Sequence, residues 1–222
     1  MVPTKERNVT GIYLNYKDEG ILFDCGEGTQ RQMNIAGIKR TRVKKILVSH
    51  WHGDHVSGII GLIQTIGNSE DPPILQIFGP IGTKEKMAHM LNSVIFDSKV
   101  EVKITEIEPK GKVKVFFENE DYHLEAADMS HSVPCIGFSF VEKDKLRIKK
   151  SFLEKYGIDE GPHLKKLKAG EDIEFNGKKI SAKDATTLVR GKKITYISDT
   201  MPCKGIVELA DEADIMISEA CY

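Results

Sequence analysis

Short runs of apolar residues, separated by polar turns, predict a succession of strands and helices along the chain. Two such runs, Gly11–Tyr16 and Ile21–Cys25, are joined by the polar residues 17–20 and indicate a β-hairpin. The run Lys45–Val48 has strand character, and Val56–Ile66 has the length and apolar content of a buried helix. The residues between this strand and this helix are therefore expected at the C-terminal end of a strand, where open α/β sheets carry their sites.

The same pattern extends over most of the chain. Helices are expected over a stretch that ends near Ala36 and over Thr83–Phe96 and Gly205–Ala213. Strands are expected at Ile74–Phe78, Glu101–Ile107, Lys112–Glu118, Tyr122–Ala127, Lys193–Ser198 and Asp214–Ser218. The chain contains no internal repeat and no low-complexity tract.

The character of the chain changes between Lys143 and about Ala185, where lysines are dense. Two short helical pieces are separated by Gly157–Pro162, and a hairpin is expected to turn at Asn176-Gly177. This stretch is typical of an insertion that projects from a folded core. We therefore expect residues 1–142 and 186–222 to form the core and residues 143–185 to form an inserted arm, which either meets a phosphate backbone or merely adds solubility.

Composition and charge fit a protein of one large domain or two small ones. The chain has 222 residues, 40% hydrophobic and 29% charged, and a net charge of −1, so the whole does not indicate a nucleic-acid partner. Charge is nevertheless segregated, because residues 143–193 hold 15 Lys and Arg against 8 Asp and Glu. A polar N-terminus and the lack of an apolar run of about 18 residues predict a protein that is neither exported nor membrane-spanning. Four cysteines without a Cys-x-x-Cys pair predict reduced thiols and a cytoplasmic location: Cys25, Cys135, Cys203 and Cys221.

Four potential metal ligands follow the strand Lys45–Val48 within six residues: His50, His52, Asp54 and His55. Side chains two positions apart in an extended chain point the same way, so the first two histidines can bind one ion. Gly53 lets the backbone turn, so that the aspartate and the third histidine can face a second ion. Imidazole suits zinc, and two ions about 3.5–4 Å apart can clamp a phosphodiester for in-line attack. The alternative is a histidine-rich surface turn that binds metal only adventitiously.

Further candidates lie at the ends of other predicted strands. His131 follows a strand and opens a proline-containing turn, which ranks it first among the histidines outside the central motif. Asp199 also ends a strand and is well placed to bridge two ions. Asp24 could orient a ligand histidine through a hydrogen bond, and the glycines at 26 and 28 could expose backbone N–H groups to a phosphate.

Taken together, these motifs resemble the tRNase Z (ribonuclease Z) family of the metallo-β-lactamase superfamily. The His-x-His-x-Asp-His motif is common to the superfamily, whereas the other motifs are more particular, and the match covers essentially the whole chain. The resemblance rests on PTKERN at Pro3–Asn8, LFDCGEGTQRQ at Leu22–Gln32, SHWHGDH at Ser49–His55, the His131 loop, SDT at Ser198–Thr200, and the Gly-Pro arm at Gly157–Glu171.

The resemblance implies an α/β fold of the metallo-β-lactamase αβ/βα sandwich type and a centre of two Zn²⁺ ions per subunit, if the site is complete. His50, His52 and His131 would hold one zinc, Asp54 and His55 the other, and Asp199 would bridge them. Asp54 would also accept a proton. A water activated by zinc would attack the phosphodiester that joins a 3′ trailer to precursor tRNA, leaving a 3′-hydroxyl on the tRNA.

The resemblance also implies how the substrate binds. The arm would hold the tRNA elbow through Gly161, Pro162, Lys165, Lys166 and Lys168, while Lys5 and Arg7 would lie near the tRNA 3′ end. A homodimer is implied, in which the arm of one subunit holds tRNA for the metal site of the other.

The chain departs from the family pattern at three places. It begins almost on PTKERN, it carries Ser218 where the family has a histidine, and no histidine follows His163 to serve as the last zinc ligand. The expected fold therefore lacks its first strand and its C-terminal part, and the enzyme would be truncated or impaired. Two alternatives stay open: another phosphodiesterase of the same superfamily, and a non-catalytic tRNA-binding subunit.

Overall fold

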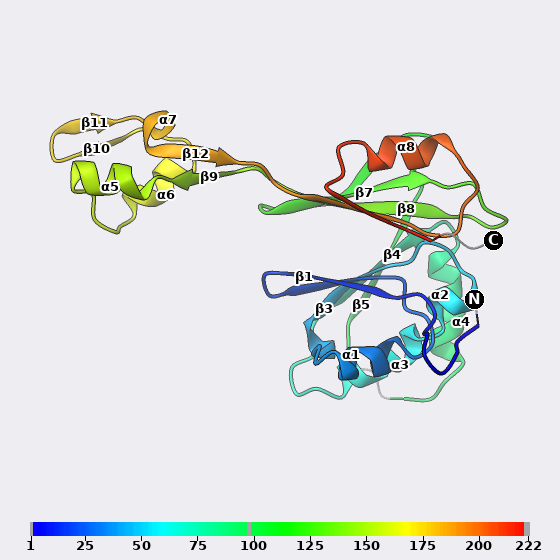
Figure 1. Cartoon of the computed structure of the whole chain (residues 1–222). Coiled ribbons are helices and arrows are strands. Elements are labelled where there is room, and N and C mark those ends of the chain that lie inside the picture. Colours follow the sequence, from blue (N-terminus) through cyan, green and yellow to red (C-terminus); the bar gives the residue numbers. More distant parts are fainter. Residues whose placement is uncertain (1, 97–98, 220–222) are drawn as a thin grey trace.

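Two five-stranded sheets lie face to face in the computed structural model, which describes residues 2–96 and 99–219 (Figure 1). Helices cover the outer side of each sheet, so the layers run helix, sheet, sheet, helix. The expected αβ/βα sandwich is confirmed. Among the described residues, no helix has both the length and the apolar composition needed to cross a membrane.

The first sheet has the strand order β1-β2-β3-β4-β5. Strands β1 and β2 form the expected antiparallel hairpin, and β2 to β5 are parallel because the chain returns through a helix or loop after each strand. Its strands are β1 (Ile12–Tyr16), β2 (Glu19–Phe23), β3 (Val43–Leu47), β4 (Leu75–Pro80) and β5 (Val102–Ile107). The helical segments between them are α1 (Thr29–Ile35), the 3₁₀ turn η1 (Arg40–Arg42), α2 (Gly53–Val56), α3 (Ile59–Gly67) and α4 (Thr83–Asn92).

The second sheet has the order β14-β13-β8-β7-β6 and is antiparallel except for its last pair, β13 and β14. The parallel pair is joined by α8 (Lys204–Ala210). Its strands are β6 (Lys114–Glu118), β7 (Tyr122–Asp128), β8 (Ile136–Glu142), β13 (Lys193–Ile197) and β14 (Ile215–Ser218). Strand β8 was not expected from the sequence; it is the central strand, and its first five residues are buried on both faces.

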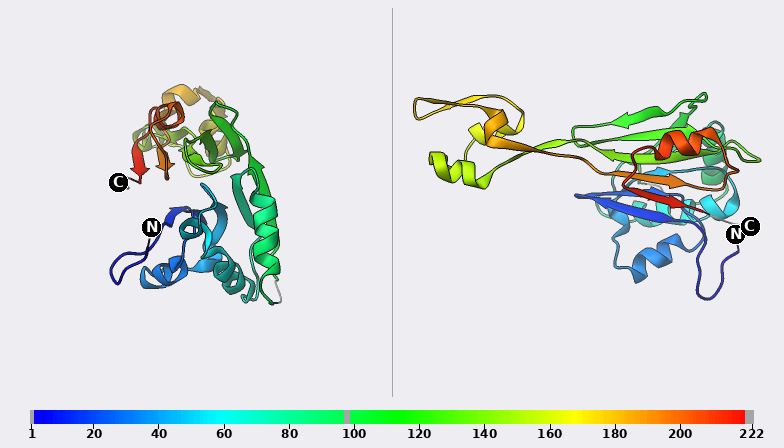
Figure 2. Two further views of the ribbon diagram at one scale, coloured as in Figure 1. Left: turned by 90° about the vertical axis from the view of Figure 1, so that its right-hand side faces the viewer. Right: turned by 45° about the horizontal axis from the view of Figure 1, so that its top comes forward.

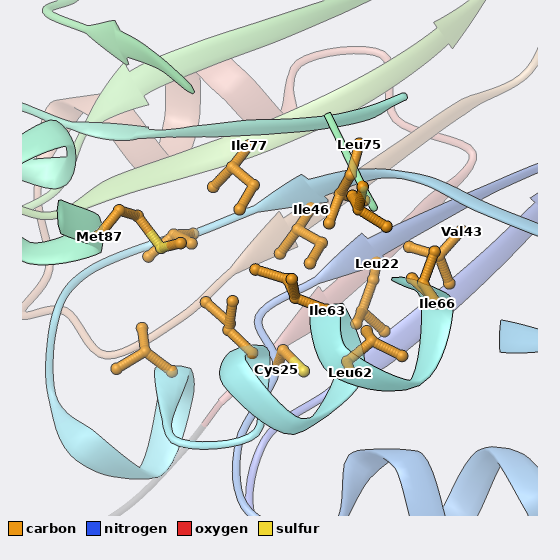
Figure 3. Packing of buried hydrophobic residues seen from close by; sticks show 14 of the residues in the cluster. Leu22, Cys25, Val43, Ile46, Leu62, Ile63, Ile66, Leu75, Ile77 and Met87 are labelled. Atoms are coloured by element: carbon orange, nitrogen blue, oxygen red, sulfur yellow. The ribbon is translucent and has the colours of Figure 1, made fainter. Parts of the chain in front are cut away.

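Three apolar clusters hold the sandwich together. Under the helices of the first sheet, Ile46 and Ile77 pack against Leu62, Ile63 and Ile66 of α3 (Figure 3). Between the sheets lies a second cluster that is rich in aromatic rings, and a smaller third cluster lies beneath α8. Burying such side chains contributes roughly 1.5–3 kcal/mol each, which makes these clusters the main source of stability.

The turn after β2 and the loop after β3 are in close backbone contact. Gly58 donates its N–H to the carbonyl of Cys25 at 2.9 Å, and Cys25 donates to the carbonyl of His55 at 2.7 Å. A Cβ atom on Gly58 would lie 2.2 Å from the carbonyl oxygen of Gly26. The absence of a side chain at Gly58 is therefore what lets the two loops meet.

We expect Gly58→Ala to lower the free energy of unfolding by about 1–3 kcal/mol, because the added methyl group collides with backbone rather than with a movable side chain. Gly61→Ala in helix α3 is the matched control. A Cβ atom there would meet nothing within 4 Å, so the change should raise the free energy of unfolding by about 0.5–1 kcal/mol. Urea denaturation of both variants measures the difference, and equal stabilities would contradict the close contact.

An arm leaves the sandwich on a two-stranded ribbon in which β9 (Lys145–Ile148) pairs with β12 (Thr186–Val189), separately from the two large sheets of the described chain (Figures 1 and 2). The ribbon was not expected, whereas the two short helices and the hairpin at Asn176-Gly177 are confirmed. The arm contains α5 (Lys150–Tyr156), α6 (His163–Lys168), β10 (Ile173–Phe175), β11 (Lys178–Ile180) and α7 (Ala182–Ala185). It encloses its own small apolar cluster: Ile158, Leu167, Ile173, Ile180, Ala182 and Ala185.

Candidate metal centre

The candidate ligands meet where several loops converge at one end of the sandwich. Residues 50–55 follow β3, His131 lies in the loop between β7 and β8, and Asp199 follows β13. Hydrogen bonds join these loops: Ile136 donates its N–H to the carbonyl of Ser49 at 3.0 Å, and Met201 donates to that of Ser130 at 2.8 Å. The two sheets thus bring together side chains that lie up to about 150 positions apart.

Three imidazoles and one carboxylate form the first cluster. The Nδ1 atom of His52 lies 3.0 Å from Nε2 of His50 and 3.2 Å from Nε2 of His131. Nε2 of His50 lies 3.9 Å from Oδ2 of Asp199, and the four ligand atoms all lie within 4.8 Å of one another. Nitrogen atoms bound to one tetrahedral zinc are separated by roughly 3.4 Å, given Zn–N bonds of about 2.0–2.1 Å. The spacing and the donor set fit a single metal ion.

Charge favours the same interpretation. Burial, together with the neighbouring His55, lowers the pKa of His50 to about 4. This histidine is therefore neutral near pH 7, and a neutral imidazole has the free lone pair that a metal ion requires.

The second cluster centres on His55, which is fully buried on α2. Its Nε2 atom has no hydrogen-bond partner among the described residues and lies 3.8 Å from Oδ2 of Asp199. An orphaned buried polar atom costs about 1–3 kcal/mol, so it points to a ligand. Burial lowers the pKa of His55, but the hydrogen bond that His55 donates to Asp24 and the charges of three carboxylates outweigh it and raise the pKa overall. A metal cation bound at Nε2 would take the place of the proton that the neighbouring carboxylates favour on His55.

Asp24 fixes the orientation of this histidine. Its buried carboxylate accepts hydrogen bonds from Nδ1 of His55 at 2.9 Å, from the Tyr196 hydroxyl at 2.7 Å, and from the backbone and hydroxyl of Ser49, both at 2.7 Å. Because Nδ1 is engaged, Nε2 is the nitrogen left for a metal. The contribution of Tyr196 was not foreseen, since a tyrosine within a strand carries no local signal of such a contact.

Two further carboxylates, those of Asp54 and Glu219, lie near His55. Asp54 lies beside His55, with its Oδ2 atom 3.7 Å from Nε2, but it belongs to neither mutual cluster of ligands. Glu219, which the sequence analysis missed, joins His55 and Asp199 in the second cluster. Its place follows from the strand pairing: β14 is parallel to β13 with Ser218 opposite Ile197, so the residues just after both strands lie side by side.

The glycine-rich turn is less open than expected. The N–H groups of Cys25, Gly26 and Thr29 donate to backbone carbonyls of His55, Thr10 and Gly26, so those three are not available to a phosphate.

The predicted substrate-binding residues lie in two separate places. Lys5 and Arg7 are exposed on a turn in which Thr4 donates its N–H to the Arg7 carbonyl, and this turn leads to Thr10, which contacts the glycine-rich turn. The arm lies at the other end of the sandwich, because it follows β8 whereas the His131 loop precedes it (Figure 1). It carries Gly161 and Pro162 just before α6 and the exposed lysines at 165, 166 and 168. The structure does not bring the arm to the candidate ligands of its own chain.

Comparison with known proteins identifies relatives of this chain. The family model of the metallo-beta-lactamase superfamily matches residues 5–132. Ribonuclease Z of Thermococcus gammatolerans is 42% identical over 226 residues, which cover 100% of this chain and 70% of that protein. Ribonuclease Z of Nanoarchaeum equitans is 37% identical and is matched over 68% of its length by 100% of this chain.

Solved structures agree on the fold. Human tRNase Z, short form, superposes with a TM-score of 0.66 at 23% identity, over 97% of this chain and 73% of that chain. The metallo-beta-lactamase fold protein YhfI from Bacillus subtilis gives a TM-score of 0.61 at 14% identity, over 99% and 66%.

Proposed function

Because this chain belongs to the ribonuclease Z family of the metallo-beta-lactamase superfamily, we propose that it cuts 3′ trailers from precursor tRNA with the help of two bound zinc ions. It is an endoribonuclease that acts in tRNA 3′ processing. The observation that carries the proposal is the buried, unpartnered Nε2 of His55 beside three converging imidazoles.

We assign the first ion to His50, His52 and His131 and the second to Asp54 and His55, with Asp199 between them. A bound metal pair lowers the pKa of the attacking water and offsets negative charge on the phosphodiester. Asp54 would accept the proton of that water, since its carboxylate lies at the partly exposed edge of the cluster, beside His55. Attack at the phosphorus 3′ of the discriminator nucleotide would then leave a tRNA 3′-hydroxyl.

The arm, residues 143–185, would bind the tRNA elbow through Gly161, Pro162 and the exposed lysines of α6, and Lys5 and Arg7 would approach the tRNA 3′ end. The placement of the arm supports a homodimer, because the arm projects away from the metal cluster of its own chain. One subunit would then hold the tRNA that its partner cleaves. We place this activity in the cytoplasm, where the free thiols of Cys25, Cys135 and Cys203 are stable.

Incubation with a 3′-extended precursor tRNA labelled at its 5′ end tests the proposal. We expect one product that ends at the discriminator nucleotide with a 3′-hydroxyl, formed only when metal is present. Hydrolysis of a small phosphodiester without tRNA cleavage would favour a different phosphodiesterase of the superfamily. Tight tRNA binding without cleavage of either compound would indicate a non-catalytic binding subunit.

A further inference from the structure

We propose that Glu219 supplies a carboxylate ligand to the second cation, so that His55, Asp199 and Glu219 form an oxygen-rich metal position. The inference rests on the proposed function, because it concerns the second ion of the same centre. It assigns to this chain a ligand that neither the motif pattern nor the family resemblance had indicated.

The position of Glu219 follows from the pairing of the last two described strands. Its N–H group donates to the carbonyl of Ile197 at 3.1 Å, which continues the parallel ladder of β13 and β14 for one more residue. This hydrogen bond sets Glu219 beside the segment that carries Asp199. Because the backbone is fixed by the ladder, the carboxylate is held near the centre by the sheet itself.

The side chain points toward the cluster. One carboxylate oxygen of Glu219, one oxygen of Asp199 and one ring nitrogen of His55 all lie within 4.8 Å of one another. Glu219 is half-buried. Burial and the charge of Asp24 raise the pKa of Tyr196, and the charge of Glu219 adds to them.

Two carboxylates alone would not make a metal site, because acidic groups gather on many protein surfaces. Here the third member is a fully buried imidazole whose Nε2 atom lacks a hydrogen-bond partner among the described residues. Its other nitrogen is held by Asp24, so the ring cannot turn to satisfy the orphaned atom elsewhere. A cation between Nε2 and the two carboxylates would satisfy it.

The chemistry of the two positions differs. The first position offers three imidazoles and one carboxylate, a set that suits zinc. The second offers one imidazole and the carboxylates of Asp199 and Glu219 in addition to that of Asp54, and carboxylate oxygen suits harder ions such as Mn²⁺. We therefore expect the second position to accept Mn²⁺ while the first retains Zn²⁺.

Metal titration of the full chain, stripped with a chelator, tests this inference without an activity assay. Calorimetry with Zn²⁺ should give two equivalents for the unaltered protein. In Glu219→Gln, which keeps the shape and removes the charge, the second equivalent should bind at least about tenfold more weakly, and the first should be unchanged. Glu219→Asp should restore part of the affinity, and Glu70→Gln, at an exposed loop residue, is the matched control.

Electron paramagnetic resonance adds an independent readout. Protein loaded with one equivalent of Zn²⁺ and then one of Mn²⁺ should show a bound-manganese signal that Glu219→Gln loses. Two equivalents with unaltered affinities in Glu219→Gln would overturn the inference, and so would an unaltered protein that binds only one ion. Neither result depends on RNA cleavage. If the unaltered protein binds two ions but leaves precursor tRNA intact, the proposed function fails while this inference stands.

Discussion

Replacing His52 by alanine is expected to lower the rate of precursor tRNA cleavage by about a thousandfold or more. Its Nδ1 atom lies between the ring nitrogens of His50 and His131, at 3.0 Å and 3.2 Å, so it is the common neighbour in the first cluster. Losing it removes one of three imidazoles from that position. Metal ions contribute several kcal/mol to such reactions, and about 4 kcal/mol corresponds to a factor of a thousand in rate.

Single-turnover cleavage at saturating enzyme, together with elemental analysis of the bound metal, measures the effect. Because His52 is partly exposed and outside the apolar clusters, the variant should unfold at nearly the same urea concentration as the unaltered protein. His89→Ala, at an exposed position on α4, is the matched control and should leave the rate and the metal content unchanged. A His52→Ala protein with full metal content and an undiminished rate would rule out the proposed centre.

Removing the arm is expected to weaken tRNA binding by about a hundredfold or more while turnover of a small phosphodiester stays the same. Residues 145–189, which the deletion described below removes, carry 11 basic against 7 acidic side chains, and each phosphate neutralised by such basic side chains adds affinity that falls as salt rises. The arm has its own apolar cluster and its ribbon pairs with neither large sheet, so its removal should leave the sandwich intact.

The structure indicates where to cut. Strand β9 begins at Lys145 opposite Val189 of β12, so an Asn-Gly turn in place of Lys145–Val189 would close a hairpin between Asp144 and Arg190. Lys145 also contacts Tyr16 and Glu142, and the loss of those contacts should cost some stability. Filter binding at several salt concentrations measures the affinity for tRNA. The rate of hydrolysis of a small phosphodiester measures the activity of the metal centre without the arm.

A second variant separates charge from shape. With Lys165, Lys166 and Lys168 changed to glutamine in the intact arm, the dependence of log affinity on log salt should become shallower by about 0.7–0.9 for each lysine that contacts a phosphate. An equal loss of small-ester turnover and tRNA affinity in the shortened protein would instead mean that the arm supports the fold of the centre.

Local patterns predicted much of this molecule because their signals are contained in neighbouring residues. An apolar run, a cluster of histidines and a second apolar run predicted the order strand, ligands, helix, and the structure has it as β3, α2 and α3. Asn176-Gly177 predicted a hairpin because asparagine and glycine tolerate the positive φ that a two-residue turn needs. In the structure their φ angles are 50° and 72°. Strand β8 was not predicted, because a strand buried on both faces shows no alternation of apolar and polar residues.

The type of fold and the cluster of candidate ligands after β3 could be predicted from the sequence, since both depend on residues close together in the chain. Which distant groups join that cluster depends on how the two sheets pack. The pairing of β13 with β14 brings Glu219 beside Asp199, and the packing of the two sheets sets Tyr196 against Asp24. The physical reason is that a carboxylate or a hydroxyl has no local signature of its partner: its role depends on what the sheets bury next to it, and burial is a property of the whole fold.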